Sequence, residues 1–220
     1  MTRGMSGHER VAAGDAQPLL IFPYNGNGRE ALDCLGDAYR CVGFVDDTPD
    51  KQGTDAHGHR VFDRAALAER PDAAVLAVPG SPTSYRSRRE LIDGLKIARD
   101  RFARVVHPSA SVSPSAVVGR NVLLMAGVVI TSDAVVGDHV CILPNTVVHH
   151  DAEIGAWTLI GSNVTIAGGT AVGKNCYIGS GSSIMNGLRV GDGALIGMGT
   201  TVIRDVPAGA RVVGTPARRL

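Results

Sequence analysis

The 220-residue sequence has few aromatic residues, no long hydrophobic run and almost no net charge. Aromatic residues make up only 4% while glycine occurs 28 times, which indicates a core of small branched side chains. The formal net charge of +1 gives no support for bulk attraction to nucleic acid or to an anionic membrane, although local patches can still bind phosphates. No apolar stretch of about 18 residues occurs, so no membrane span is expected.

Cysteine is also scarce, and its spacing argues against a metal or redox motif. The four cysteines are Cys34, Cys41, Cys141 and Cys176, and no two of them form a CxxC pair. We therefore expect reduced structural thiols in a cytoplasmic protein, with disulfides as the alternative. Residues 1–17 are polar and lack an apolar centre, which excludes a secretory signal and favours a disordered extension.

The C-terminal half has a strict six-residue repeat without insertion or deletion. Every sixth residue in it is Val, Ile or Leu, namely Val112, Val118, Leu124, Ile130, Val136, Ile142, Val148, Ile154, Ile160, Ile166, Val172, Ile178, Ile184, Val190, Ile196 and Val202. A short fixed period marks stacked units that cannot each bury an apolar face alone, and a six-residue period is that of a parallel β-helix.

This repeat gives each residue a position in the predicted solenoid. Three hexads make one triangular coil of a left-handed β-helix, so residues 18 apart stack along one face. The residue four after each branched one is mostly small and is expected to point inward. Glycine often follows the branched residue, as at Gly137, Gly155 and Gly173, and we expect such glycines at corners with unusual backbone angles. The filled interior leaves no lumen, so chemistry belongs on an outer face or between chains.

The N-terminal half alternates short apolar runs with helical patterns. We expect strands at residues 19–22, 41–45 and 73–78, and helices at residues 29–35, 63–70 and 87–99. This alternation predicts a doubly wound parallel sheet that binds ligands at the carboxyl ends of its strands. The predicted fold is thus a Rossmann-like parallel α/β domain over residues 18–106, followed by a left-handed parallel β-helix over residues 107–220.

The turn after the first strand is a candidate substrate site. Its residues Asn25, Gly26, Asn27 and Gly28 can adopt positive φ and aim backbone N–H groups at a phosphate. The turn is not GxGxxG, since Pro23 and Asn25 replace glycines of that motif, so a dinucleotide site is poorly supported. A turn that only links strand to helix is the alternative.

Two acidic residues, Asp46 and Asp47, end the second predicted strand. An acidic side chain at this place can accept hydrogen bonds from ribose hydroxyls. We therefore include both as candidate substrate-binding residues, with solvated turn residues as the alternative.

The outward polar group of the solenoid that stands out is His149-His150-Asp151. A neighbouring aspartate fixes the tautomer of a histidine and stabilises its protonated form, as in a general base. Gly168 and Asn186 follow His150 by 18 and 36 residues, so they are expected to stack on it one and two coils further along. A glycine there leaves room for a ligand and exposes an N–H suited to an oxyanion. The alternative is a histidine that bonds a neighbouring backbone carbonyl.

Zinc binding is a competing interpretation of the same histidines. Trimeric β-helix hydratases of the gamma carbonic anhydrase kind assemble a three-histidine site across a subunit boundary, and His139, His149 and His150 are available. His139 and His149 are ten residues apart, which places them on different hexads, and no further outward histidine follows. We therefore expect no metal.

Taken together, the hexads, the segment 148–151 and the ending 206–218 resemble the hexapeptide acetyltransferases. More narrowly, the chain from about Leu19 resembles nucleotide-sugar acetyltransferases that include the bacillosamine-pathway and sialic-acid-type enzymes. The stretches that carry this resemblance are 43–47 with 51–53, 107–110 at the domain junction, and 148–151 with 154–155.

The resemblance implies a homotrimer that binds acetyl-CoA between adjacent β-helices and a sugar nucleotide on the N-terminal domain. It makes His150 the base and Asp151 the residue that orients it. The chain departs from the family in its first turn, which lacks the usual glycine run ending in histidine, and at Leu159, where a second histidine is common. His149 stands where the family commonly has Asn or Glu, and we include it as a candidate substrate-binding residue that partly compensates for the histidine missing at Leu159.

We accordingly expect acetyl transfer from acetyl-CoA to the amino group of a nucleotide-linked sugar, such as a 4-amino-4,6-dideoxyhexose. The Gly168 amide would stabilise the oxyanion, and the pantetheine would pass Asn186 toward Arg204 or Arg218, which would meet the CoA phosphates. Three alternatives stay open: an O-acetyltransferase, a zinc hydratase and a non-catalytic sugar-nucleotide binder.

Overall fold

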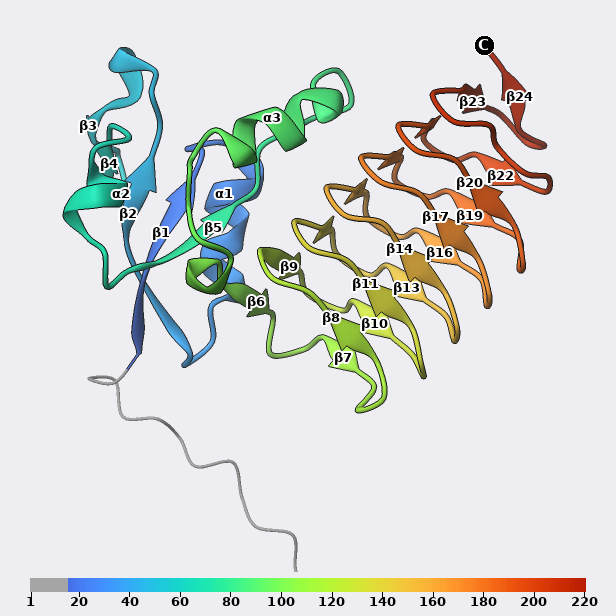
Figure 1. The fold of residues 1–220 in the computed structure, drawn as a ribbon, viewed down its shortest axis with the longest axis horizontal. Coiled ribbons are helices and arrows are strands. Elements are labelled where there is room, and N and C mark those ends of the chain that lie inside the picture. Colours follow the sequence, from blue (N-terminus) through green and yellow to red (C-terminus); the bar gives the residue numbers. More distant parts are fainter. Residues whose placement is uncertain (1–15) are drawn as a thin grey trace, which may run out of the picture.

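The computed structural model describes residues 16–220, and these form an α/β domain beside a long solenoid (Figure 1). Most of the predicted extension, residues 1–17, lies outside the described residues, and Gln17 already opens strand β1. Within the described part of the chain, no helix has the length and apolar character needed to cross a membrane.

The α/β domain is built on a five-stranded sheet with the order β3-β4-β2-β1-β5. Its strands are β1 (Gln17–Phe22), β2 (Tyr39–Val45), β3 (Gly53–Thr54), β4 (Arg60–Phe62) and β5 (Ala74–Ala77). The predicted strands correspond to β1, β2 and β5, which pair in parallel. The sheet is not wholly parallel, because the short hairpin of β3 and β4, which the sequence did not predict, adds an antiparallel edge.

The second and third helices lie within the predicted segments but are shorter, whereas the first begins three residues before the predicted residue 29 and gives way to a 3-10 turn after Glu30. They are α1 (Gly26–Glu30), α2 (Ala66–Glu69) and α3 (Arg88–Asp93), with 3-10 turns at Ala31–Cys34, Pro49–Lys51, Tyr85–Ser87 and Arg99–Arg101. The third helix was expected to reach residue 99. It ends early because the chain turns at Gly94 and Lys96 adopts a φ of 54°.

The solenoid consists of three sheets, one for each side of a triangular prism, and their strands pair in parallel except for the last, β24, which is antiparallel to β23. The first side holds β7 (Ser111–Val112), β10 (Val129–Ile130), β13 (Val147–Val148), β16 (Thr165–Ile166), β19 (Ser183–Ile184) and β22 (Thr201–Val202). The second holds β8 (Val117–Val118), β11 (Val135–Val136), β14 (Glu153–Ile154), β17 (Ala171–Val172) and β20 (Arg189–Val190). The third, which we call the docking side, holds β6 (Arg104–Val106), β9 (Val122–Leu124), β12 (Cys141–Ile142), β15 (Leu159–Ile160), β18 (Tyr177–Ile178), β21 (Leu195–Ile196), β23 (Arg211–Val213) and β24 (Arg218–Arg219). Because β6 pairs with β9, the left-handed β-helix starts slightly before the predicted residue 107.

The interior of the prism is filled as the repeat predicts. The branched residues Ile130, Val148, Ile166 and Ile184 are at most 1% exposed and stack on one another 18 residues apart. Small side chains four residues further on, such as those of Ala152 and Thr170, complete this core. These side chains fill the interior of the prism within residues 16–220, as the repeat predicted.

The predicted reason for the glycines after the branched residues is wrong. Gly137, Gly155 and Gly173 do not have positive φ. They are glycine because the next coil passes too close for a side chain: a Cβ at Gly155 would lie 2.4 Å from the carbonyl carbon of Gly173. Positive φ occurs two residues later instead, at a position that Asp, Asn, Gly and even Trp157 occupy.

The N-terminal domain covers the docking side of the prism. Outward residues of that side, Leu123, Cys141 and Leu159, are at most 3% exposed and pack in one cluster with Ile21 and Phe44 of the sheet. Burial raises the pKa of Cys141 to about 12, which keeps this thiol protonated. None of the four cysteines is in a disulfide, consistent with the expected reduced thiols.

One corner of the prism, which we call the seam corner, is sealed by the segment from Ala77 to Arg88. Arg88 is fully buried and donates to the backbone oxygens of Pro79, His139 and Trp157. Burial lowers the pKa of Arg88 to about 10, so it remains a cation at neutral pH whose charge is held by carbonyl dipoles. The two domains are thus joined by polar bonds to successive coils as well as by apolar packing.

His139 is a neutral member of this seam corner. Its ring stacks on Trp157 with 5.4 Å between centroids, and its Nδ1 lies 3.1 Å from the side-chain amide nitrogen of Asn121. The amide donates, so Nδ1 is unprotonated. Burial lowers the pKa of His139 below its ordinary value of 6.5.

The seam should therefore weaken in mild acid. Because the folded pKa of His139 is lowered, the unfolded chain binds more protons below about pH 6.5, and stability is lost as the pH falls. We expect the melting temperature to drop between pH 7 and pH 5, and to drop less in His139→Gln. Calorimetry across this range measures both, and equal pH slopes for the two proteins would contradict the assignment.

Candidate active site

His150 and Asp151 form a hydrogen-bonded pair at the corner between β13 and β14, which we call the dyad corner. His150 Nδ1 lies 2.7 Å from Asp151 Oδ2, and both side chains are 65% exposed. Asp151 has a φ of 58°, the backbone conformation shared by the same position in neighbouring coils. The carboxylate fixes the proton on Nδ1 and leaves Nε2 free to accept a proton from a ligand.

Gly168 lies directly against the imidazole, one coil beyond. A Cβ on Gly168 would approach Cε1 and Nε2 of His150 to 2.6 Å. Any residue other than glycine would therefore displace the imidazole ring. The predicted stacking of residues 18 apart is supported here, since Gly169 N–H donates to the His150 carbonyl oxygen at 2.9 Å. The N–H of Gly168 has no hydrogen-bond partner among residues 16–220. A free base and a free backbone donor therefore lie next to each other.

A cluster of arginines lies further along the dyad corner, at the C-terminal end of the prism. Asn186 is the exposed residue of the next coil, and Arg204 follows it. Arg204 and Arg218 both line a cavity of about 260 Å³ at the C-terminal end of the prism, together with Arg219. At the roughly 4.8 Å spacing of neighbouring strands, Arg204 lies three coils, or about 14 Å, from His150.

The first turn differs from its prediction. None of its residues has positive φ, and Asn25 instead caps α1, its Oδ1 accepting from Gly28 N–H at 2.8 Å. Gly28 is buried, and a Cβ there would meet the Pro23 carbonyl oxygen at 2.4 Å. Its N–H is used, so Gly28 cannot donate to a ligand. The N–H groups of Gly26 and Asn27 have no partner among the described residues.

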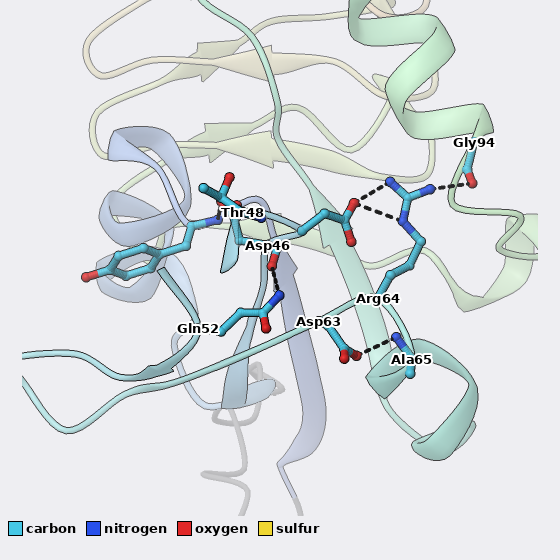
Figure 2. A network of polar contacts seen from close by, with 9 residues as sticks. Asp46, Thr48, Gln52, Asp63, Arg64, Ala65 and Gly94 are labelled. Carbon is cyan, nitrogen blue, oxygen red and sulfur yellow. Dashed lines mark hydrogen bonds and ion pairs between the residues drawn. The ribbon is translucent and has the colours of Figure 1, made fainter. Parts of the chain in front are cut away.

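Asp46 holds the loops together and does not present a free carboxylate. It is 4% exposed and binds Lys51 Nζ at 2.9 Å, Tyr24 N–H at 3.2 Å and Thr48 N–H at 3.0 Å. Its backbone oxygen accepts from Gln52 (Figure 2). Both carboxylate oxygens thus order the surrounding loops, although Asp46 also lines a cavity that it shares with Asp47, where its Oδ1 accepts only the Thr48 N–H and has a further lone pair.

Asp47 remains accessible. Its Oδ2 accepts from Arg64 at 2.6 Å, and Arg64 also donates to the Gly94 carbonyl oxygen (Figure 2). Asp47 lines a cavity of about 370 Å³, which we call the acceptor slot, at the carboxyl ends of β1, β2 and β5. Its other walls are Phe22, Pro23, Asp46, Thr48, Lys51, Pro79 and Leu91. An apolar floor with a polar rim suits a nucleoside.

Sequence reasoning missed Lys51 and Leu91 as members of this slot. Lys51 lies in the stretch 51–53, which carries part of the family resemblance. Its place in the slot depends on its 3.2 Å bond to the Tyr24 carbonyl oxygen, which joins two loops that are distant in sequence. Leu91 projects from α3 and is 37% exposed. Nothing in the sequence distinguishes one exposed apolar residue from another, and only the fold shows that Leu91 lies beside the other slot residues.

His149, Leu159 and His139 lie in three different surroundings. His149 is half-buried on the side that contains β13, next to the dyad. Leu159 is 3% exposed in the cluster between the domains, so it does not face the His150 side of its own chain. His139 is held in the seam corner, away from His149 and His150, and no group of three metal-binding side chains occurs among the described residues.

Comparison with known proteins agrees with this geometry. Residues 133–168 and 169–204 match the family model for the bacterial transferase hexapeptide (six repeats). The acetyltransferase domain of PglB from Neisseria gonorrhoeae, also solved with acetyl coenzyme A, is 27% identical and has a TM-score of 0.81, covering 93% of this chain and 100% of its own. PerB from Caulobacter crescentus, solved with CoA and GDP-perosamine, is 27% identical with a TM-score of 0.79, covering 93% of this chain and 97% of its own.

The chain contains the bacterial transferase hexapeptide repeat and shares its fold with these acetyltransferase structures. A third structure, WeeI from Acinetobacter baumannii, shares the fold at 24% identity, with a TM-score of 0.78 over 93% of this chain and 100% of its own. No curated protein matches the chain in sequence.

In this chain, the dyad and the α/β domain lie on opposite sides of the prism. The domain packs on the docking side, whereas His150 lies at the corner between the other two sides. One chain therefore does not bring its own acceptor slot to its own base.

The fit of the imidazole over Gly168 predicts a sharp difference between adjacent glycines. Gly168→Ala should displace the His150 ring and lower kcat by about 10²-fold, the cost of a misplacement near 1 Å, without unfolding the protein. The matched control is Gly169→Asn, because Gly169 has a φ of 65° that Asn tolerates and open space around it. Steady-state kinetics compare the two variants. Equal activities would contradict the role of Gly168.

Proposed function

We propose that the protein transfers an acetyl group from acetyl-CoA to the amino group of a nucleotide-linked amino sugar, with a 4-amino-4,6-dideoxyhexose as the preferred acceptor. The observation that carries this is the free Nε2 of His150 beside the unbonded N–H of Gly168. Acetyl transfer needs a base for the attacking amine and a donor for the carbonyl oxygen, and this corner offers both. PerB was solved with a nucleotide-linked amino sugar, which supports the acceptor class.

His150 removes the proton from the attacking nitrogen. As the C–N bond to the acetyl carbonyl carbon forms, Nε2 takes the proton and the ring becomes an imidazolium. Asp151, 2.7 Å from Nδ1, stabilises that cation. When the tetrahedral intermediate collapses, the C–S bond breaks and the imidazolium returns the proton to the departing thiolate of CoA.

The Gly168 amide stabilises the oxyanion of this intermediate. A backbone donor needs no reorganisation as negative charge develops, which is why such donors contribute strongly to acyl transfer. The pantetheine of CoA extends along the dyad corner past Asn186. Arg204 and Arg218 meet the CoA phosphates at the end of the prism, where guanidinium groups suit phosphate oxygens.

The acceptor nucleotide occupies the slot of a neighbouring chain in a homotrimer. The slot and the dyad of one chain lie on opposite sides of the prism, so a complete site needs two copies. Exposed apolar side chains on the two uncovered sides support contacts between copies, namely Val117 (60% exposed), Val135 (39%), Met185 (47%) and Ile203 (41%). Asp47, Gly26 and Asn27 contact the nucleotide, while Asp46 shapes the slot.

Replacing the base tests the proposal most simply. His150→Ala should lower kcat by about 10²- to 10⁴-fold, the usual contribution of general base catalysis, with an unchanged melting temperature because the side chain is exposed. Release of CoA thiol is measured with amino-sugar nucleotides as acceptors. His149→Ala, at the neighbouring candidate substrate-binding histidine, is the comparison and should raise the KM for the acceptor while leaving kcat largely unchanged.

The acceptor atom is tested in the same assay. A matched sugar nucleotide with a hydroxyl in place of the amino group should be acetylated far more slowly by the wild-type protein. Faster transfer to the hydroxyl would make the protein an O-acetyltransferase. Near-normal turnover of His150→Ala with the amine would contradict the assignment of the base.

A further inference from the structure

A second cationic pocket lies on the docking side, away from the dyad. It has a volume of about 290 Å³ and is lined by Pro82, Thr83, Tyr85, Arg86, Leu195 and Arg211. The first four belong to the segment after β5, and the last two project from β21 and β23. We call it the seam pocket, because both domains contribute to it.

Arg86 is held in a fixed position at this pocket. Its Nε lies 3.1 Å from the Tyr85 hydroxyl, and its Nη2 donates to the Gly209 carbonyl oxygen at 3.2 Å. Tyr85 is 4% exposed and donates in turn to the Gly193 carbonyl oxygen at 2.9 Å. A guanidinium held by backbone and phenol oxygens keeps further N–H groups free and loses little entropy when an anion binds.

Arg211 supplies a second, uncommitted cation. Its side chain makes no hydrogen bond or ion pair with any residue of the described range 16–220. No Asp or Glu lines the pocket. The neighbouring acid of the seam corner, Asp192, directs its Oδ1 to the backbone N–H of Lys174 at 2.7 Å. Two arginines without a carboxylate leave the pocket with an unbalanced positive charge.

The segment before Arg86 adds hydroxyl groups. Ser81 Oγ lies 3.0 Å from Thr83 Oγ1 and 2.9 Å from Ser84 Oγ, so three hydroxyls are gathered in one turn. Thr83 itself lines the pocket. Guanidinium and hydroxyl groups together match the oxygen atoms of a phosphate, whereas a carboxylate ligand would leave several of these donors unused.

We propose that the seam pocket binds a phosphate group of a small molecule and thereby ties the α/β domain to the last coils of the prism. Arg86 and Arg211 are its principal ligands. The pocket is separate from the arginine cluster at the end of the prism, whose residues Arg204, Arg218 and Arg219 do not line it. The phosphate belongs either to the 3′ position of CoA or to a separate metabolite.

Binding measurements with Arg211→Gln test the proposal and distinguish the two sources. The probes are inorganic pyrophosphate, CoA and dephospho-CoA, titrated calorimetrically at low salt. If a separate metabolite is the ligand, Arg211→Gln weakens pyrophosphate binding about tenfold in CoA-saturated protein and leaves CoA affinity unchanged. If CoA supplies the phosphate, the variant weakens CoA about tenfold and leaves dephospho-CoA unchanged.

Arg120→Gln is the matched control. It removes the same charge from a residue at the other end of the seam corner and should change none of these affinities. Arg86→Gln should repeat the effect of Arg211→Gln, and melting temperatures identify any variant that fails to fold. Unchanged binding of all three probes in folded Arg211→Gln, or an equal loss in Arg120→Gln, would overturn the proposal.

Discussion

The parallel pairing of each residue with the one 18 positions later determines the rest of the structure. Val148 pairs with Ile166, and Ile166 with Ile184, so each coil repeats the position of the one before it. Burial of the branched residues in the centre of the prism drives this stacking. The close approach of coils then demands glycine at Gly155, where a Cβ would overlap the next coil. An insertion of one residue would misplace both the core and the outer corners.

The candidate active site depends on the same stacking. His150 can lie over the backbone only because Gly168 occupies the same row in the next coil, and Asp151 can reach Nδ1 because the corner turns with positive φ. Rigid coils hold these groups without a lid or a metal-binding cluster in the described residues. The dyad corner of a convex prism forms only one wall of the proposed site, so the proposed site needs a second element to bind the acceptor. The α/β domain, fixed by Arg88 and the seam corner, supplies that second element.

Features that depend on periodicity could be predicted from the sequence, whereas features that depend on distant contacts could not. The stacking of Gly168 on His150 could be predicted, because the repeat is constant and residues 18 apart occupy the same position in successive coils. The contacts of Asp46 could not be predicted, because its partners Tyr24 and Lys51 come from two other loops. The positive-φ position escaped notice because residues as unlike as Asp151 and Trp157 occupy it.

The buried arginine of the seam corner is a second feature that depends on distant contacts. Arg88 carried no signal in the sequence, since two of the oxygens that it binds belong to His139 and Trp157, which lie 51 and 69 residues further along the chain. A single arginine in a helical pattern is ordinarily a solvated residue. Only the packing of α3 against the prism places its guanidinium among backbone carbonyls.

The central claim is that the base of one chain serves the acceptor slot of another, and mixed trimers test it directly. His150→Ala chains lack the base, and Leu91→Glu chains carry a charged side chain in the acceptor slot. Each variant alone should be inactive. When the two are unfolded and reassembled in equal amounts, random association in a cyclic trimer should restore about a quarter of wild-type activity, because one site in four combines two intact halves. A mixture that assembles into mixed trimers and stays inactive would show that base and slot act within one chain.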